Sequence, residues 1–138
     1  MRYVVDTSVV LKWAIREDDS DAAIDLVGYF LAAPDLIRAE LANALWKKVR
    51  RRNIGEAQAL DALPRLLEPL DLLAVGDHSG RALEIGIELE HPVYDCFFLA
   101  VAEALQIPLI TADRRLARTC AGTRFAPLVH VLGEELPS

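Results

Sequence analysis

Four acidic residues of this 138-residue sequence lie at positions where parallel α/β proteins carry out chemistry. Asp6 directly follows the first apolar run of the chain, and Asp113 comes two residues after a later one. If both runs are strands of one parallel sheet, the two carboxylates share the edge at which such sheets bind ligands. Glu40 is expected early in a helix, at the border of its apolar face. Asp95 is expected in the first turn of a helix that follows another helix, so the pattern leaves its place open.

Carboxylates that converge on one cleft repel one another, so they raise each other's pKa or recruit a cation. Oxygen ligands without Cys or His select Mg²⁺ or Mn²⁺ rather than Zn²⁺. Such ions bind phosphate oxygens and activate water for attack on a phosphodiester. Each acid also has a structural interpretation, because Asp6, Asp95 and Asp113 suit helix starts and Glu40 suits an exposed helix face. Spacing alone leaves both interpretations open.

Basic residues form two clusters. One is expected at the C-terminal end of a helix, where cations either complement the helix dipole or contact a phosphate backbone. The other adjoins Asp113, and here we favour phosphate contact. The first cluster comprises Lys47, Lys48, Arg50, Arg51 and Arg52, and the second comprises Arg114, Arg115 and Arg118.

Motifs for several other chemistries are missing. The sequence has no G-x-S-x-G, no G-x-G-x-x-G and no Gly-Lys pair, which excludes a nucleophile elbow, a dinucleotide fingerprint and a P-loop. His78, His91 and His130 are scattered, and we interpret them as surface or strand histidines rather than ligands. Cys96 and Cys120 lie in apolar segments, so we expect reduced core thiols.

The composition indicates one domain, spanning residues 1–138, with a real hydrophobic core. The chain is 53% hydrophobic, which excludes disorder. Its formal charge of -6 argues against a protein that coats nucleic acid with a basic surface. The N-terminus does not resemble a signal peptide and no apolar stretch approaches the roughly 20 residues of a membrane span, so we expect a cytoplasmic protein.

Short apolar runs alternate with helical patterns along the chain. We predict strands at 3–5, 70–75, 108–111 and 129–132, and helices near 20–30, 36–52, 56–67, 78–89 and 93–105. The helix at 20–30 is expected to bury Val27 and Phe30, with a break at 33–35. This order of elements predicts a three-layer α/β/α domain with a central, mostly parallel sheet.

Four segments, in this order, resemble the PIN-domain family and in particular the VapC-type toxins of toxin–antitoxin pairs. The resemblance covers essentially the whole chain and implies a PIN-like fold and an endoribonuclease that depends on Mg²⁺ or Mn²⁺. The segments are Val4–Ser8, Arg38–Leu41, Tyr94–Ala100 and Thr111–Leu116.

The resemblance also implies roles for individual residues. Asp6, Glu40, Asp95 and Asp113 match the family's catalytic and metal-binding acids, with Asp6 and Asp95 as the principal ligands. A homodimer and a cognate VapB-type antitoxin are the implied protein partners, and RNA is the implied substrate. The positions expected to orient ligands or water are Thr7, Ser8 and Thr111.

Two other functions remain open at this point. One is phosphoryl transfer through an aspartyl phosphate at Asp6, as in haloacid dehalogenase-like or receiver-like folds. The sequence speaks against it, because no acid stands two residues after Asp6 and all three lysines lie before the middle of the chain. The other is an α/β module that binds RNA or a protein partner without catalysis.

Overall fold

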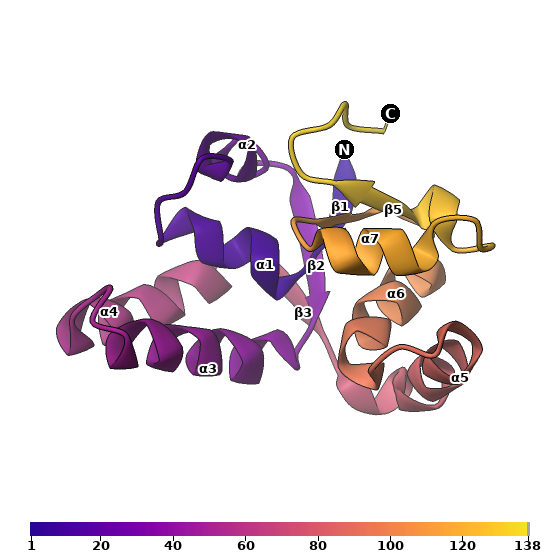
Figure 1. Ribbon diagram of the computed structural model, residues 1–138, viewed down its shortest axis with the longest axis horizontal. Coiled ribbons are helices and arrows are strands. Elements are labelled where there is room, and N and C mark those ends of the chain that lie inside the picture. Colours follow the sequence, from indigo (N-terminus) through magenta and orange to yellow (C-terminus); the bar gives the residue numbers. More distant parts are fainter. Residues whose placement is uncertain (138) are drawn as a thin grey trace.

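The computed structural model describes residues 1–137 and builds them around a five-stranded, entirely parallel sheet (Figure 1). The strand order is β3-β2-β1-β4-β5. The strands are β1 (Arg2–Val5), β2 (Phe30–Pro34), β3 (Leu70–Leu73), β4 (Leu109–Thr111) and β5 (Val129–Val131).

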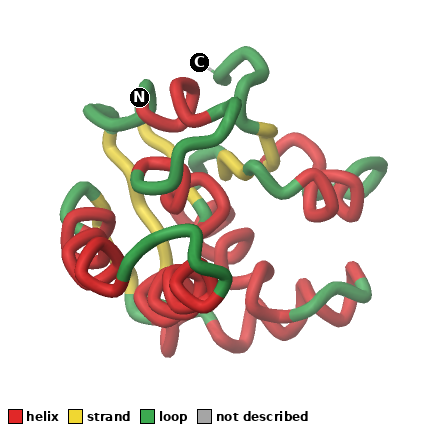
Figure 2. The backbone as a smooth tube through the Cα atoms, turned by 60° about the vertical axis from the view of Figure 1, so that its left-hand side comes forward, coloured by secondary structure: helices red, strands yellow, loops and turns green. Residues whose placement is uncertain are grey.

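Helices cover both faces of the sheet, which confirms the predicted α/β/α architecture (Figure 2). In Figure 1 the first four helices lie to the left of the strands and α5 and α6 lie to the right, while α7 packs on β4 and β5. The helices are α1 (Thr7–Val10), α2 (Ser20–Ile24), α3 (Ile37–Arg50), α4 (Glu56–Leu67), α5 (Ser79–Leu89), α6 (Val93–Leu105) and α7 (Arg114–Cys120).

The central strand β1 and its neighbour β4 form the middle of the hydrophobic core. Val4, Val5, Leu109 and Ile110 are fully buried, because a strand between two helical layers has no face toward water. This burial explains why both strands are near-continuous apolar runs in the sequence. None of the helices in residues 1–137 has the length and apolar character required to cross a membrane.

The order in which strands are added to the sheet reverses between β1 and β4. From β1 the chain continues outward to β2 and β3, and from β4 it continues in the opposite direction to β5. Parallel sheets bind ligands at such a switch point, outside the carboxyl ends of the strands. Val5 pairs with Ile110 there, so the residues that follow the two strands start side by side.

One predicted element is wrong. Residues 30–34 form the buried strand β2 rather than the end of a long helix, and α2 has only five residues. Val27 and Phe30 are 47% and 38% exposed instead of buried. α2 ends at Ile24, Gly28 adopts φ +113° in the turn that follows, and pairing with both β1 and β3 then fixes the strand. Tertiary pairing overrides local propensity in a segment this rich in alanine.

The turn between α5 and α6 brings these helices into close contact. Glu90 ends α5 in the left-handed conformation, and the His91 N–H donates to the Gly86 carbonyl at 3.1 Å. A Cβ atom on Gly86 would lie 3.1 Å from the His91 carbonyl oxygen and 3.0 Å from a methyl carbon of Val93. A side chain at position 86 would therefore push the backbone of the turn outward by a few tenths of an ångström.

We predict that Gly86→Ala lowers the free energy of unfolding by about 1–3 kcal/mol, because the added methyl group overpacks a rigid turn. Gly80→Ala in the same helix is the matched control, since nothing lies within 4 Å of its Cβ position. That control should be neutral or stabilising by up to about 1 kcal/mol, because alanine favours helix. Urea denaturation measures both, and equal effects of the two substitutions would contradict the packing argument.

Candidate active site

A small cavity of about 170 Å³ lies at the carboxyl edge of β1 and β4. The cavity brings together all four acids that the sequence analysis selected, including Asp95, whose place the sequence left open. It is lined by Asp6, Thr7, Ser8, Glu40, Asp95, Phe98 and Asp113.

Asp6 is the most buried of these acids and only 7% exposed. It caps α1, with Oδ1 accepting from the Val9 N–H at 3.3 Å and from the Ser8 hydroxyl at 2.5 Å. The Thr111 hydroxyl, from β4, donates to Oδ2. Burial raises the Asp6 pKa to about 6 against the lowering effect of these hydrogen bonds. Asp6 is therefore both the cap of α1 and a residue of the cavity.

Glu40 reaches the cavity from α3. The Thr7 hydroxyl, at the start of α1, donates to its Oε1 atom at 2.7 Å. Burial raises the pKa of Glu40, and the negative charge of Asp95 adds to this effect. Asp95 also raises the pKa of Asp6, so the carboxylates sense each other electrostatically.

Asp113 caps α7, as its sequence position predicted. Its Oδ1 atom accepts from the backbone N–H groups of Arg115 and Leu116 at 2.9 and 3.3 Å. Its own N–H donates to the Thr111 hydroxyl at 3.0 Å, and the Ala112 N–H donates to the Ser8 hydroxyl at the same distance. The two hydroxyls thus link the loop after β4 to Asp6.

Asp95 has a partner that the sequence analysis missed. His91 Nε2 lies 2.7 Å from Asp95 Oδ2, and His91 is buried with 9% exposure. The interpretation of His91 as a surface or strand histidine is therefore wrong. The available signal was its spacing, four residues before an acid and directly before Pro92, at which a helix begins.

Cys96 is a core thiol, as the sequence predicted. It is fully buried, and its Sγ atom donates weakly to the Pro92 carbonyl at 3.6 Å. Burial raises its pKa to about 11, so the thiol stays protonated at neutral pH and is a poor nucleophile.

Comparison with known proteins identifies the family. The sequence model for the PIN domain matches residues 3–122. The protein belongs to the PIN-domain family. Ribonuclease VapC1 of Mycobacterium tuberculosis is 36% identical over 116 residues, covering 80% of this chain and 75% of that protein. Ribonuclease VapC3 of Pyrobaculum aerophilum is 34% identical over 122 residues, covering 85% and 93%.

Solved structures show the same PIN-domain architecture. The crystal structure of PAE2754 from Pyrobaculum aerophilum has 28% identity and a TM-score of 0.69, with 89% of this chain and 82% of that chain covered. A toxin–antitoxin complex from Klebsiella pneumoniae has a chain with 16% identity and a TM-score of 0.71, with 96% and 99% covered. At that identity the second likeness concerns the fold alone.

The donor set of this PIN domain fits a hard divalent cation. The four carboxylates offer oxygen ligands, and a cation would relieve the repulsion that the charge of Asp95 exerts on Asp6 and Glu40. PIN-domain ribonucleases generally depend on a divalent metal. Among residues 1–137, however, no three His, Cys, Asp or Glu side chains form a ready-made metal site. Suitable donors line the cavity, but within residues 1–137 no three of them are arranged closely enough to hold one ion as they stand.

The two basic clusters differ in their distance from this cavity. Arg114 and Arg115 are exposed at the start of α7, directly after Asp113. The other cluster lies at the far end of α3, whose first turn carries Glu40. At a rise of 1.5 Å per residue, its members on the helix lie about 10–15 Å from Glu40 along the axis. The cluster after β4 is therefore the one that adjoins the acids.

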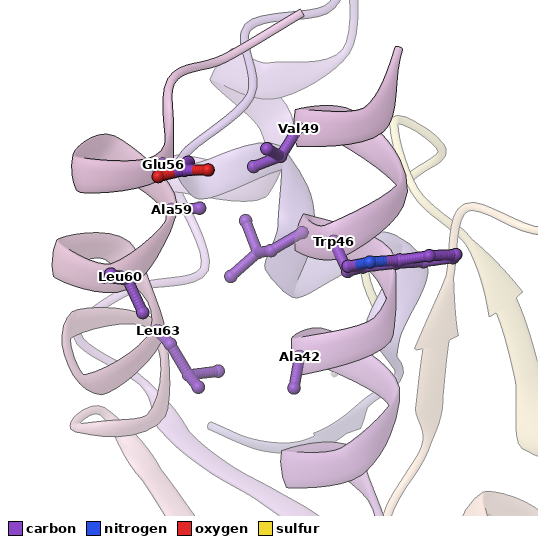
Figure 3. A pocket seen from close by; sticks show the side chains of 8 residues that line it. Ala42, Trp46, Val49, Glu56, Ala59, Leu60 and Leu63 are labelled. Atoms are coloured by element: carbon purple, nitrogen blue, oxygen red, sulfur yellow. The ribbon is translucent and has the colours of Figure 1, made fainter. Parts of the chain in front are cut away.

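A second, apolar hollow separates α3 from α4. It has a volume of about 360 Å³, and Figure 3 shows Ala42 and Val49 of α3 facing α4 across the gap. Leu60 is 77% exposed beside it, and Trp46 extends to the other side of α3 with 54% exposure. Among the described residues that line this groove, Glu56 is the one with an ionisable side chain. Its lining comprises Ala42, Leu45, Trp46, Val49, Glu56, Ala59, Leu60 and Leu63.

The raised Asp6 pKa makes stability depend on pH in the metal-free protein. The folded state binds this proton more tightly than the unfolded chain, whose Asp titrates near 3.8. The stabilising contribution is fully present below that pH and is lost as the pH rises through about 6. We predict that Asp6→Asn in EDTA is more stable than wild type by roughly 2–3 kcal/mol at pH 7.5, because it removes a buried charge.

Urea denaturation between pH 4 and 8 measures this difference, which should shrink as the pH falls toward 4. Asp71→Asn is the matched control, since Asp71 is exposed on β3. It should change the free energy of unfolding by less than about 0.5 kcal/mol at either end of the range. A stability difference for Asp6→Asn that does not vary with pH would contradict the burial of an ionisable carboxyl group.

Proposed function

We propose that this protein is an endoribonuclease that depends on Mg²⁺ or Mn²⁺ and hydrolyses RNA phosphodiester bonds as the toxin of a type II toxin–antitoxin pair. The observation that carries the proposal is the meeting of four carboxylates in one cavity at the switch point of a PIN-domain sheet. The ribonuclease names of relatives about 35% identical support the reaction.

Each acid has a distinct part in this reaction. Asp6 and Asp95 would hold the cation, and Glu40 and Asp113 would complete its surroundings directly or through water. When bound, the divalent cation supplies a Lewis acid that polarises the phosphoryl oxygen and makes water a stronger nucleophile at neutral pH. Thr7, Ser8 and Thr111 fix the carboxylate oxygens by donating hydroxyl hydrogen bonds.

Glu40 is the carboxylate best suited to take a proton from the attacking water. In the metal-free protein, burial raises its pKa and the charge of Asp95 adds to this effect. Thr7 holds only Oε1, so Oε2 remains available to accept. The proton leaves the water as the new bond to phosphorus forms, and the leaving oxygen departs on the opposite side.

The RNA backbone approaches past Arg114 and Arg115, which place positive charge directly beside the acidic cavity. Lys47, Lys48 and Arg50 to Arg52 extend the positive surface along α3 and can contact phosphates further along the strand. This arrangement explains how a chain of net charge -6 handles a polyanion. Local cations and the bound metal, rather than the overall charge, attract the RNA.

The protein partners follow from the same proposal. Chains of similar fold occur in toxin–antitoxin complexes, which supports a VapB-type antitoxin as the inhibitor. An exposed apolar groove such as that between α3 and α4 supports a protein partner, because apolar helices dock in grooves of this kind. We also propose a homodimer that acts in the cytoplasm.

The aspartyl-phosphate alternative fits the structure less well. Asp6 is 7% exposed, and both of its oxygens already accept hydroxyl hydrogen bonds. No lysine lines the cavity to neutralise a phosphoryl group, and Lys12 is engaged with Glu17 and Asp19. A binding module without catalysis remains distinguishable by experiment, because it would hold RNA equally well in EDTA.

We predict that Asp6→Asn and Asp95→Asn each lower RNA cleavage by about 100-fold or more, because each removes a ligand of the cation. The cation would stabilise the charge that develops in the transition state by roughly several kcal/mol. Both variants should remain folded by circular dichroism. Asp71→Asn is the control and should cleave like wild type. Cleavage of a fluorescent RNA pool in Mg²⁺ measures the effect, and full activity of either cavity variant, or of wild type in excess EDTA, would sink the proposal.

We predict that Arg114→Ala with Arg115→Ala weakens RNA binding and flattens its salt dependence. The slope of log affinity against log salt should fall by about 0.7 for each phosphate that the double variant no longer neutralises. The measurement uses the cleavage-deficient Asp6→Asn background in Mg²⁺, so that the RNA stays intact. Arg65→Ala, an exposed arginine on α4, is the control. An unchanged slope in the double variant would remove these arginines from the RNA path.

A further inference from the structure

Each of the four cavity acids is held by a hydrogen-bond donor, and the donors differ in kind. Asp6 has two hydroxyls and a backbone N–H, Glu40 has the Thr7 hydroxyl, and Asp113 has two backbone N–H groups. Within the described residues 1–137, the donor to Asp95 is the His91 ring. His91 therefore serves Asp95 as a hydrogen-bond donor, as hydroxyls and backbone N–H groups serve the other acids.

The capping residue of α6 offers Asp95 no backbone N–H as a hydrogen-bond donor. Asp95 is the third residue of the helix, where an acid often folds back to the N–H of the capping residue. The capping residue here is Pro92, which has no N–H. Asp95 is also partly exposed, with 36% of its side chain accessible, so an unheld carboxylate would sample several rotamers.

The backbone around His91 is fixed on both sides. Its N–H donates to the Gly86 carbonyl, and the Cys96 thiol lies near its carbonyl oxygen at 4.0 Å. The side chain is 5% exposed, so the ring is enclosed by other parts of the protein. A carboxylate only accepts hydrogen bonds, so Nε2 carries the hydrogen of the 2.7 Å contact.

We infer that His91 is a positioning residue: its Nε2–H group holds Asp95 Oδ2, so that the carboxylate is pre-set as a ligand for the divalent cation. This inference rests on the proposed function, since it needs a cation in the cavity. A fixed donor to a ligating carboxylate reduces the freedom lost on binding, and loss of such outer partners typically weakens metal affinity by about 10–100-fold.

The test compares His91 variants that differ in whether they can donate from this position. His91→Ala and His91→Phe lack a donor, and Phe keeps a buried ring. His91→Gln places an amide N–H near the position of Nε2. His78→Ala is the control histidine outside the cavity lining. Protein stripped with EDTA and dialysed is titrated with Mn²⁺ alone by isothermal calorimetry, and the thermal midpoint of each variant is measured without metal.

We expect the two donor-less variants to bind Mn²⁺ about 10–100-fold more weakly than wild type and His91→Gln to recover most of the affinity. The thermal midpoints of the variants should not rank in the same order as their Mn²⁺ affinities, because Phe and Gln both fill the buried site. If affinity instead follows the thermal midpoint, or if Gln is as weak as Phe, His91 is merely structural and the inference fails. Affinities within about twofold of wild type in all variants would also overturn it.

These results are separable from a failure of the proposed function. Wild-type protein that binds no Mn²⁺ and cleaves no RNA would overturn the proposed function, and the inference with it. Wild-type protein that binds and cleaves, with His91 variants that match it, would overturn the inference alone.

Discussion

Burial of carboxylates at one edge of the sheet is the constraint on which the rest of the site depends. The parallel sheet places Asp6 and Asp113 side by side after β1 and β4, and α3 and α6 add Glu40 and Asp95. Burial and mutual charge raise the pKa values of Asp6 and Glu40. Neighbouring hydroxyls and one histidine compensate in part by donating hydrogen bonds, and the divalent cation of the proposed function would compensate further.

The same constraint explains why the supporting residues are small and polar. Ser8 and Thr111 bridge the loops after β1 and β4, and each hydroxyl both donates to Asp6 and accepts from a backbone N–H of the second loop. Such a chain of hydrogen bonds locks the two strand ends together. Asp6 and Asp113 are consequently both helix caps and candidate ligands, so for these two acids neither interpretation excludes the other.

The sequence predicted the parts of this arrangement that depend on local order along the chain. Apolar runs located β1 and β4, and the rule that ligands bind at the carboxyl edge placed Asp6 and Asp113 together. β2 escaped prediction because its alanines carry little strand propensity and its pairing partners lie far away in sequence. Asp95 could not be placed because the path of two consecutive helices over a sheet is set by packing, whereas the contact of His91 with Asp95 follows a local i,i+4 spacing that the sequence did offer.

The most direct test of the central claim is a carbon-13 NMR titration of the Asp6 carboxyl group, first in EDTA and then in saturating Mg²⁺. An apparent pKa near 6 is expected in the metal-free protein. Because a bound cation favours the ionised carboxylate, Mg²⁺ should lower that pKa below its ordinary value. A pKa close to 3.8 without metal, or one that Mg²⁺ leaves unchanged, would contradict the claim that the carboxylates form a cation site.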